Sequence, residues 1–124
     1  MGGTARGLVI EDNHLIALYL QDVLGELGYR DVLVAHDLAT GFTLLGSVKP
    51  ERAVLDVRIG IALIYPLAEA LLRQHVPFIF YSDMPRTSLP PQWRSYPLVS
   101  KFAGKTFRAR ALDATRPMQL LVQH

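Results

Sequence analysis

Residues 53–57 are Ala53-Val54-Leu55-Asp56-Val57, an apolar run interrupted by a single carboxylate. A run with no polar alternation is typical of a strand in a parallel sheet whose two faces are both covered by helices. Four other short runs, rich in branched and aromatic residues, have the same character: residues 8–10, 32–35, 76–81 and 98–99. Because helix-like stretches separate them, the sequence predicts an α/β fold with five parallel strands.

The first two connections carry clear helix signals. Apolar residues at helical spacing follow a cap at Asp12 or Asn13, and Gly28 is placed to end that helix. A second helix is predicted from a cap at Asp37. Gly41 lies inside it and costs about 1 kcal/mol relative to alanine, so this helix is expected to be less stable.

The later connections are less regular. A third helix is predicted to begin near Tyr65, after an unusually apolar loop at residues 60–64. Three prolines within residues 84–96 each remove a backbone donor, so the fourth helix is expected to be short or irregular. A last helix is predicted from Gly104 or Lys105, with residues 117–124 as a tail.

The bulk composition is that of one domain. The chain has 124 residues, half of them hydrophobic, and no cysteine, which excludes disulfides and thiolate metal sites. No apolar run is long enough to span a bilayer and the start lacks a signal peptide, so residues 1–6 are interpreted as a disordered lead-in and the cytoplasm is the expected location. With no internal repeat or linker, residues 1–124 are expected to form a single domain.

Charge is unevenly distributed along the chain. Residues 1–83 carry six Lys/Arg and ten Asp/Glu, whereas residues 84–124 carry seven and one. The basic residues of the second part form no run, so an ordinary solvated or protein-docking face is expected rather than nucleic-acid binding.

Polar side chains follow four of the five predicted strands: Glu11 and Asp12, Asp56, Ser82, and Lys101. The carboxyl ends of parallel strands form one edge of the sheet, where ligands of such folds bind. Three carboxylates at one edge repel one another unless a hard cation lies among them, and Mg²⁺ prefers such oxygen ligands. Asp56 could also act as a nucleophile toward phosphorus if Lys101 and the Ser82 hydroxyl neutralise charge on the transferred group.

Four motifs in this order resemble the receiver domains of response regulators in two-component signalling. They are residues 8–13 (the acidic pair), 53–57 (the phosphoacceptor strand), 77–82 (the strand ending in a hydroxyl residue) and 98–101 (the lysine strand). The resemblance covers nearly the whole chain. It implies a flavodoxin-like, doubly wound (βα)5 fold with strand order 2-1-3-4-5.

The resemblance also implies a function for the edge. Asp56 would accept a phosphoryl group, with Lys101 and Ser82 as catalytic partners. Magnesium would be held by Glu11, Asp12, Asp56 and the backbone carbonyl of Arg58. The donor would be a histidine kinase or a histidine phosphotransfer protein.

Three positions depart from the family pattern. Asp83 replaces the small residue that usually follows the hydroxyl residue, so it is expected to crowd or repel an incoming phosphoryl group. Phe102 replaces a proline after the lysine. Leu98 replaces the aromatic residue that relays the signal, for which Tyr81 or Tyr96 would be the substitutes.

Three functions therefore remain open. The first is a stand-alone receiver that is not an enzyme and signals through a downstream protein, with a homodimer as an open option and no membrane partner. The second is a receiver-like interaction module that acts without phosphorylation. The third is a Mg²⁺-dependent phosphohydrolase that passes through an aspartyl phosphate. Haloacid-dehalogenase-like enzymes of this kind have a second Asp two positions after the nucleophile, and Arg58 at that position disfavours this function.

Two other residue types receive structural interpretations. His14, His36, His75 and His124 have no mutual ligand spacing, so they are interpreted as surface or packing residues rather than zinc ligands. Trp93 is interpreted as a local packing residue.

Overall fold

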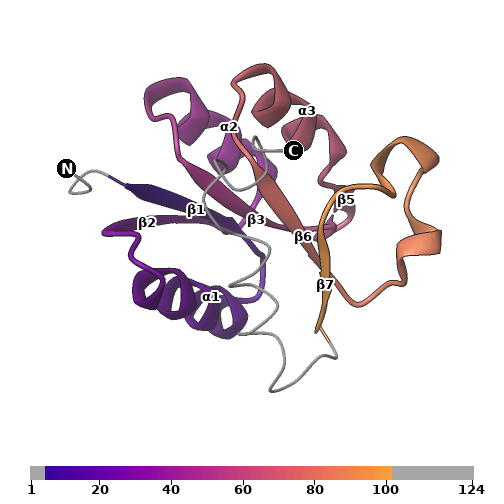
Figure 1. Ribbon diagram of the computed structural model, residues 1–124, viewed down its shortest axis with the longest axis horizontal. Helices are drawn as coiled ribbons and strands as arrows, with labels where there is room; N and C mark the ends of the chain where they lie inside the picture. The colour runs from indigo at the N-terminus through magenta and orange to yellow at the C-terminus, as the bar shows by residue number, and fades with distance from the viewer. Residues whose placement is uncertain (1–4, 102–124) are drawn as a thin grey trace, which may run out of the picture.

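A parallel five-stranded sheet forms the centre of this computed structural model, which describes residues 5–101 (Figure 1). In spatial order the strands are β2 (Asp31–Ala35), β1 (Arg6–Ile10), β3 (Arg52–Asp56), β6 (Phe78–Ser82) and β7 (Leu98–Ser100). Numbered by their sequence order within this sheet, these strands have the predicted order 2-1-3-4-5. The flavodoxin-like fold class is therefore confirmed.

Strand β1 begins earlier than predicted. Arg6, assigned to the lead-in, is its first residue and lies in register with Asp31 of β2. The Arg6 Nε and Asp31 Oδ2 atoms are 3.4 Å apart, and both side chains are half exposed. The apolar pattern could not reveal this start, because an edge ion pair carries no hydrophobic signal.

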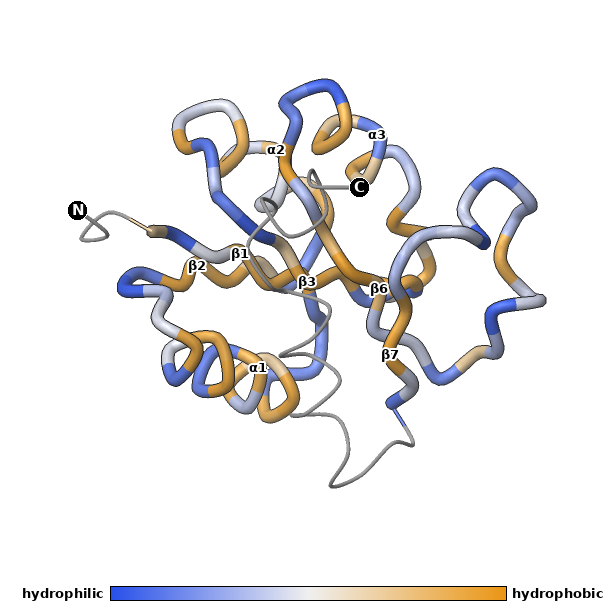
Figure 2. Tube along the Cα trace, viewed as in Figure 1, coloured by the Kyte–Doolittle hydropathy of each residue, from blue (hydrophilic) through white to orange (hydrophobic). Residues whose placement is uncertain are grey.

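Helices cover both faces of the sheet, as the apolar strands predicted. Helix α1 (His14–Glu26) packs on one face, and α2 (Leu38–Ser47) and α3 (Tyr65–Arg73) pack on the other (Figure 1). Figure 2 shows the hydrophobic residues concentrated along β1, β3 and β6, between these two layers.

Caps fix the starts of the first two helices. Asn13 is the cap of α1, since its Oδ1 accepts a hydrogen bond from the Ile16 amide at 3.0 Å. Asp37 caps α2 by accepting from the Thr40 amide at 2.7 Å. Gly28 lies just beyond α1 with φ of 107°, the left-handed conformation that glycine adopts without strain.

Gly41 has a packing role that its helix propensity does not reveal. A Cβ atom at this position would lie 2.7 Å from Leu67 Cδ1 and 3.1 Å from Ile10 Cδ1. The glycine therefore allows α2 to approach both α3 and the sheet.

The apolar segment before α3 is not a loop, so that prediction was wrong. Strands β4 (Arg58–Ile59) and β5 (Ala62–Leu63) pair as an antiparallel hairpin. Gly60 is left-handed at its turn, with φ of 63°, and Ile61 at the tip is fully exposed. Helix α3 begins at Tyr65, as predicted.

The fourth connection contains two short 3-10 helices, η1 (Arg86–Ser88) and η2 (Pro91–Trp93), which confirms the irregularity predicted from its prolines. Arg86 stabilises this segment by donating hydrogen bonds to the carbonyls of Arg94 and Tyr96, at 2.7 and 2.6 Å. Trp93 is buried and stacks on Tyr65, so its predicted packing role is confirmed.

Some predictions concern residues outside the described part of the chain, namely the last helix, Phe102, and the tail at residues 117–124. Within residues 5–101, no helix is long and apolar enough to cross a membrane.

Candidate functional site

The predicted site residues lie at the carboxyl edge of the sheet. Glu11 directly follows β1, Asp56 ends β3, Ser82 ends β6 and Lys101 directly follows β7. Since β1, β3, β6 and β7 are consecutive neighbours in the sheet, residues from four distant parts of the sequence meet at one edge.

Lys101 lies between two buried carboxylates. Its Nζ donates a hydrogen bond to Asp56 Oδ2 at 2.9 Å and lies 3.4 Å from Glu11 Oε1. Glu11 is completely buried, and Asp56 is nearly so. One ammonium therefore faces two carboxylates in a setting where water screens charge poorly.

Burial dominates the protonation of the two carboxyls. Burial raises the pKa of Glu11 to about 7, and repulsion from Asp56 adds to this effect. Burial also raises the pKa of Asp56; the hydrogen bond and charge of Lys101 oppose this effect but do not cancel it. The pair therefore retains a proton more readily than exposed carboxyls would.

Lys101 and Asp12 both favour their charged forms. Burial alone would lower the pKa of Lys101, but the hydrogen bond and charge of Asp56 outweigh burial and raise it. Burial likewise opposes ionisation of Asp12, yet the pKa of Asp12 is lowered because its Oδ2 accepts a 2.8 Å hydrogen bond from the Gly60 amide.

The three carboxylates fit a divalent cation. One oxygen from each of Glu11, Asp12 and Asp56 can be chosen so that all three lie within 4.8 Å of one another. Glu11 Oε1 is buried and has no hydrogen-bond partner among residues 5–101. An all-oxygen set with an unsatisfied buried acceptor suits a hard cation such as Mg²⁺.

Arg58 and Ser82 approach Asp56 from neighbouring segments. The Arg58 amide donates to Asp56 Oδ1 at 3.3 Å, while its exposed side chain extends to Met84 Sδ. The role of its carbonyl as a metal ligand stays a prediction. Ser82 is buried, and its Oγ accepts a hydrogen bond from the Met84 amide at 2.9 Å. Its hydroxyl hydrogen can therefore point to another acceptor.

Two of the three departures from the family pattern, Asp83 and Leu98, lie within the described residues. Asp83 is exposed directly after Ser82. Leu98 is half-buried and packs against the core beneath α2 and α3. Tyr96 stacks on Phe78 instead of facing the carboxylates, with ring centroids 5.3 Å apart.

Sequence reasoning missed three contacts of the site. Lys101 Nζ lies 5.4 Å from the ring centroid of Tyr81, the Gly60 amide binds Asp12, and His36 Nδ1 lies 2.9 Å from the Glu11 carbonyl. Gly60 was a usable sequence signal for a turn, because glycine readily adopts the left-handed conformation that many turns require. Contacts between distant segments leave no local pattern in a single sequence.

Comparisons with solved structures identify the same architecture. The chain is similar to SdrG from Sphingomonas melonis Fr1, with 30% identity over 92% of this chain and 98% of that chain and a TM-score of 0.76. It is also similar to the PhyR response regulator REC domain of Erythrobacter litoralis. The identity is 25% over 97% of this chain and 92% of that chain, and the TM-score is 0.77.

A third structure shares the fold. It is a response regulator protein from Burkholderia pseudomallei, with 22% identity over 96% of this chain and 71% of that chain and a TM-score of 0.76. No family model and no curated protein sequence matches the chain. The chain belongs to the receiver-domain family of response regulators. This follows from its similarity to SdrG and PhyR, together with its sheet order and the acidic edge that contains a lysine.

Proposed function

We propose that this protein accepts a phosphoryl group on Asp56 from a histidine kinase or a histidine phosphotransfer protein. The observation that carries the proposal is the 2.9 Å hydrogen bond between Lys101 Nζ and Asp56 Oδ2, within a cluster of three carboxylates. This arrangement presents a nucleophilic oxygen beside a fixed positive charge, which phosphoryl transfer requires.

Asp56 would attack phosphorus with one carboxylate oxygen and displace the histidine nitrogen of the donor. Lys101 favours the ionised form of Asp56 and holds its Oδ2, while the Arg58 amide holds Oδ1. Ser82 would donate its hydroxyl hydrogen to a phosphoryl oxygen, since its Oγ already accepts a hydrogen bond from the Met84 amide.

Glu11, Asp12 and Asp56 would hold Mg²⁺ beside this nucleophile. The bound cation supplies positive charge that neutralises the phosphoryl oxygens during transfer. In support, the Burkholderia pseudomallei regulator contains a phosphorylated aspartic acid and a calcium ion.

The proposal includes a signalling output rather than catalytic turnover. Phosphorylation would change how a downstream protein docks on the domain, and we place the protein in the cytoplasm. Arg58, two residues after Asp56, has no acidic group that could activate water, which argues against a phosphohydrolase.

Intact-mass spectrometry after incubation with Mg²⁺ and acetyl phosphate tests the proposal. The native protein and Asp22→Asn, a matched change on the exposed side of α1, should each gain one phosphoryl mass, whereas Asp56→Asn should gain none. Absence of any gain in the native protein would favour a phosphorylation-independent interaction module. Continuous release of phosphate that depends on Asp56 would instead identify a phosphohydrolase.

A further inference from the structure

The β4–β5 hairpin contacts two of the three carboxylates of the acidic edge through its backbone. The Arg58 amide donates a hydrogen bond to Asp56 Oδ1 at 3.3 Å. The Gly60 amide, at the turn, donates to Asp12 Oδ2 at 2.8 Å. Because Asp56 ends β3 and Asp12 follows β1, the hairpin connects the ends of two neighbouring strands at the site.

Asp12 is the exposed member of the acidic cluster, whereas Glu11 and Asp56 are buried. An exposed side chain loses rotamer freedom when it binds a ligand, unless another contact already holds it. The Gly60 amide provides such a contact. Burial opposes ionisation of Asp12, but this hydrogen bond is the largest of the effects that lower its pKa, so it favours the charged form that a cation binds.

The turn of the hairpin depends on glycine. Gly60 and Ile61 are its two central residues, and Gly60 has φ of 63°. Turns of this length need a positive φ, which glycine adopts without strain, asparagine tolerates and β-branched residues resist. A Cβ atom at Gly60 would meet nothing within 4 Å. A substitution at this position therefore acts through the backbone conformation and not through a clash.

Packing holds the two ends of the hairpin more firmly than its tip. Ile59 and Ile64 are buried, whereas Ile61 is fully exposed. Each strand has only two residues, and a hairpin this short has little stability of its own. The hydrogen bond from Gly60 to Asp12 is therefore important for keeping the turn beside the acidic cluster.

We propose that Gly60 is a positioning residue of the cation site: its amide holds the Asp12 carboxylate for a divalent cation, and the bound cation in turn stabilises the hairpin. The inference rests on the cation binding that is part of the proposed function. A neutral amide suits this role, because it orients the carboxylate without adding a full positive charge that would repel the cation. Coupling is reciprocal, so the hairpin should strengthen cation binding by the same factor by which the cation suppresses opening of the hairpin.

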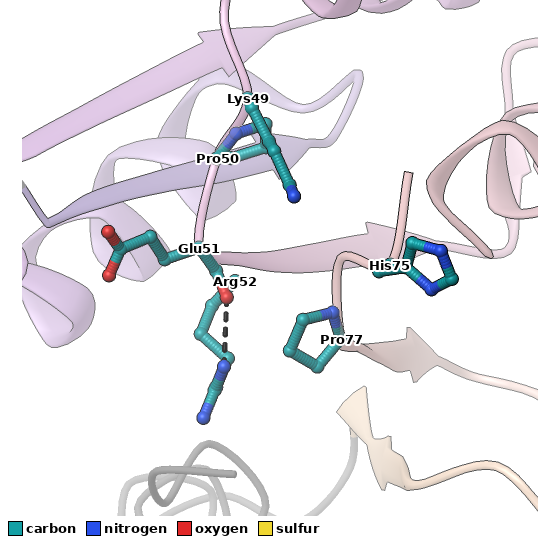
Figure 3. A pocket seen from close by; sticks show the side chains of 6 residues that line it. All are labelled: Lys49, Pro50, Glu51, Arg52, His75 and Pro77. Carbon is teal, nitrogen blue, oxygen red and sulfur yellow. Dashed lines mark hydrogen bonds between the residues drawn. The ribbon is translucent and has the colours of Figure 1, made fainter. Parts of the chain in front are cut away.

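Amide hydrogen exchange of the full-length native protein, followed by NMR with and without Mg²⁺ at constant ionic strength, tests the effect of the cation on the hairpin. Saturating Mg²⁺ should slow exchange of the Gly60 amide by about twofold to tenfold, the usual cost of immobilising one side chain on binding. The Glu51 amide, which donates to the Arg6 carbonyl at the opposite edge of the sheet (Figure 3), should exchange at an unchanged rate.

Mg²⁺ titrations of two Gly60 variants, followed by NMR, test the effect of the hairpin on the cation. Gly60→Val resists the positive φ and should weaken Mg²⁺ binding by about twofold to tenfold. Gly60→Asn also adds a side chain but tolerates this conformation, so it should retain most of the native affinity. Glu51→Gln removes an exposed carboxylate beside Lys49 at the opposite edge (Figure 3) and should bind Mg²⁺ like the native protein.

The outcomes distinguish this proposal from the proposed function. If the native protein shows no saturable Mg²⁺ binding, both the cation part of the proposed function and this inference are overturned. If the native protein binds Mg²⁺, three results overturn the inference alone: unchanged exchange of the Gly60 amide, equal affinities of Gly60→Val and Gly60→Asn, or tighter binding by Gly60→Val. The last result would show that the amide competes with the cation for Asp12.

Discussion

Lys101 neutralises Asp56 directly, with Nζ 2.9 Å from Oδ2, and the same ammonium lies 3.4 Å from Glu11 Oε1. One cation is therefore shared between two buried carboxyls, and Asp12 lies beside them. The edge has an excess of negative charge that protonation or a bound cation can relieve. Its consequences can be measured without any signalling partner.

The first consequence is a loss of stability as pH rises through neutrality. Glu11 has a pKa of about 7 in the folded protein against a reference of 4.5, so the folded state binds this proton more tightly than the unfolded state. Its stabilising contribution is complete below about pH 4.5 and is lost as pH rises through 7, by up to about 3 kcal/mol. The raised pKa of Asp56 acts in the same direction.

Urea denaturation between pH 5 and 8, without divalent cations, measures this loss. Glu11→Gln keeps the shape of the side chain and removes the titrating group, so its free energy of unfolding should vary much less with pH. The shifts of Asp12 and Lys101 act near their reference values of 3.8 and 10.5, outside this window. A native protein as stable at pH 8 as at pH 5 would contradict the prediction.

The second prediction concerns the close approach of α2 to α3. Gly41→Ala should lower the free energy of unfolding by about 1–3 kcal/mol, because the new methyl group would lie 2.7 Å from Leu67 Cδ1. Gly46→Ala is the matched control, since a Cβ at that position of the same helix meets nothing within 4 Å. It should stabilise the protein by up to about 1 kcal/mol through helix propensity. Equal effects of the two changes in urea denaturation would contradict this account.

Gly41 also marks how far sequence reasoning reaches. The helix around it and its cap at Asp37 followed from local patterns, because apolar spacing and capping act within a few residues. The strand order followed from the resemblance to receiver domains. The packing role of Gly41 did not follow from such local patterns, because it depends on Leu67, which is distant in the sequence. Propensity alone assigned only a cost to this glycine.

The candidate site divides in the same way. Glu11, Asp56 and Ser82 could be placed from sequence because each ends or follows an apolar strand, and parallel strands end at one edge. The hairpin that brings Gly60 to Asp12 was mistaken for a loop, since its strands have only two residues each. Segments this short give no measurable alternation of polar and apolar residues.

The third prediction addresses the exposed carboxylate after Ser82. Asp83→Ala should speed phosphorylation by acetyl phosphate by about threefold to tenfold at low salt, because it removes a negative charge near the incoming phosphoryl group. Asp83→Asn keeps the size of the side chain and should have the same effect if charge is the cause. If only the alanine variant is faster, the side chain obstructs the site by its size. If neither differs from the native protein in a mass-spectrometric time course, Asp83 does not limit the reaction.

The fourth prediction assigns Tyr81 a positioning role. Its ring lies beneath Lys101, with Nζ 5.4 Å from the ring centroid, and the residue is almost buried against the α1 face of the sheet. An aromatic face attracts an ammonium by about 0.5–2 kcal/mol, so the ring helps to hold Lys101 between Glu11 and Asp56. Tyr81→Leu should therefore weaken binding of beryllium fluoride, a phosphoryl mimic, by about twofold to thirtyfold in the presence of Mg²⁺.

Tyr81→Phe provides the test of this assignment, because it removes the hydroxyl and keeps the ring. Binding of beryllium fluoride should be close to native in the phenylalanine variant and reduced in the leucine variant. A purely structural role would instead lower the melting temperature of Tyr81→Leu while leaving the affinity of the folded protein unchanged. Lys101→Met gives the upper limit, because it removes the ammonium itself. If the ring acts only through Lys101, Tyr81→Leu cannot reduce the affinity for beryllium fluoride by more than Lys101→Met does.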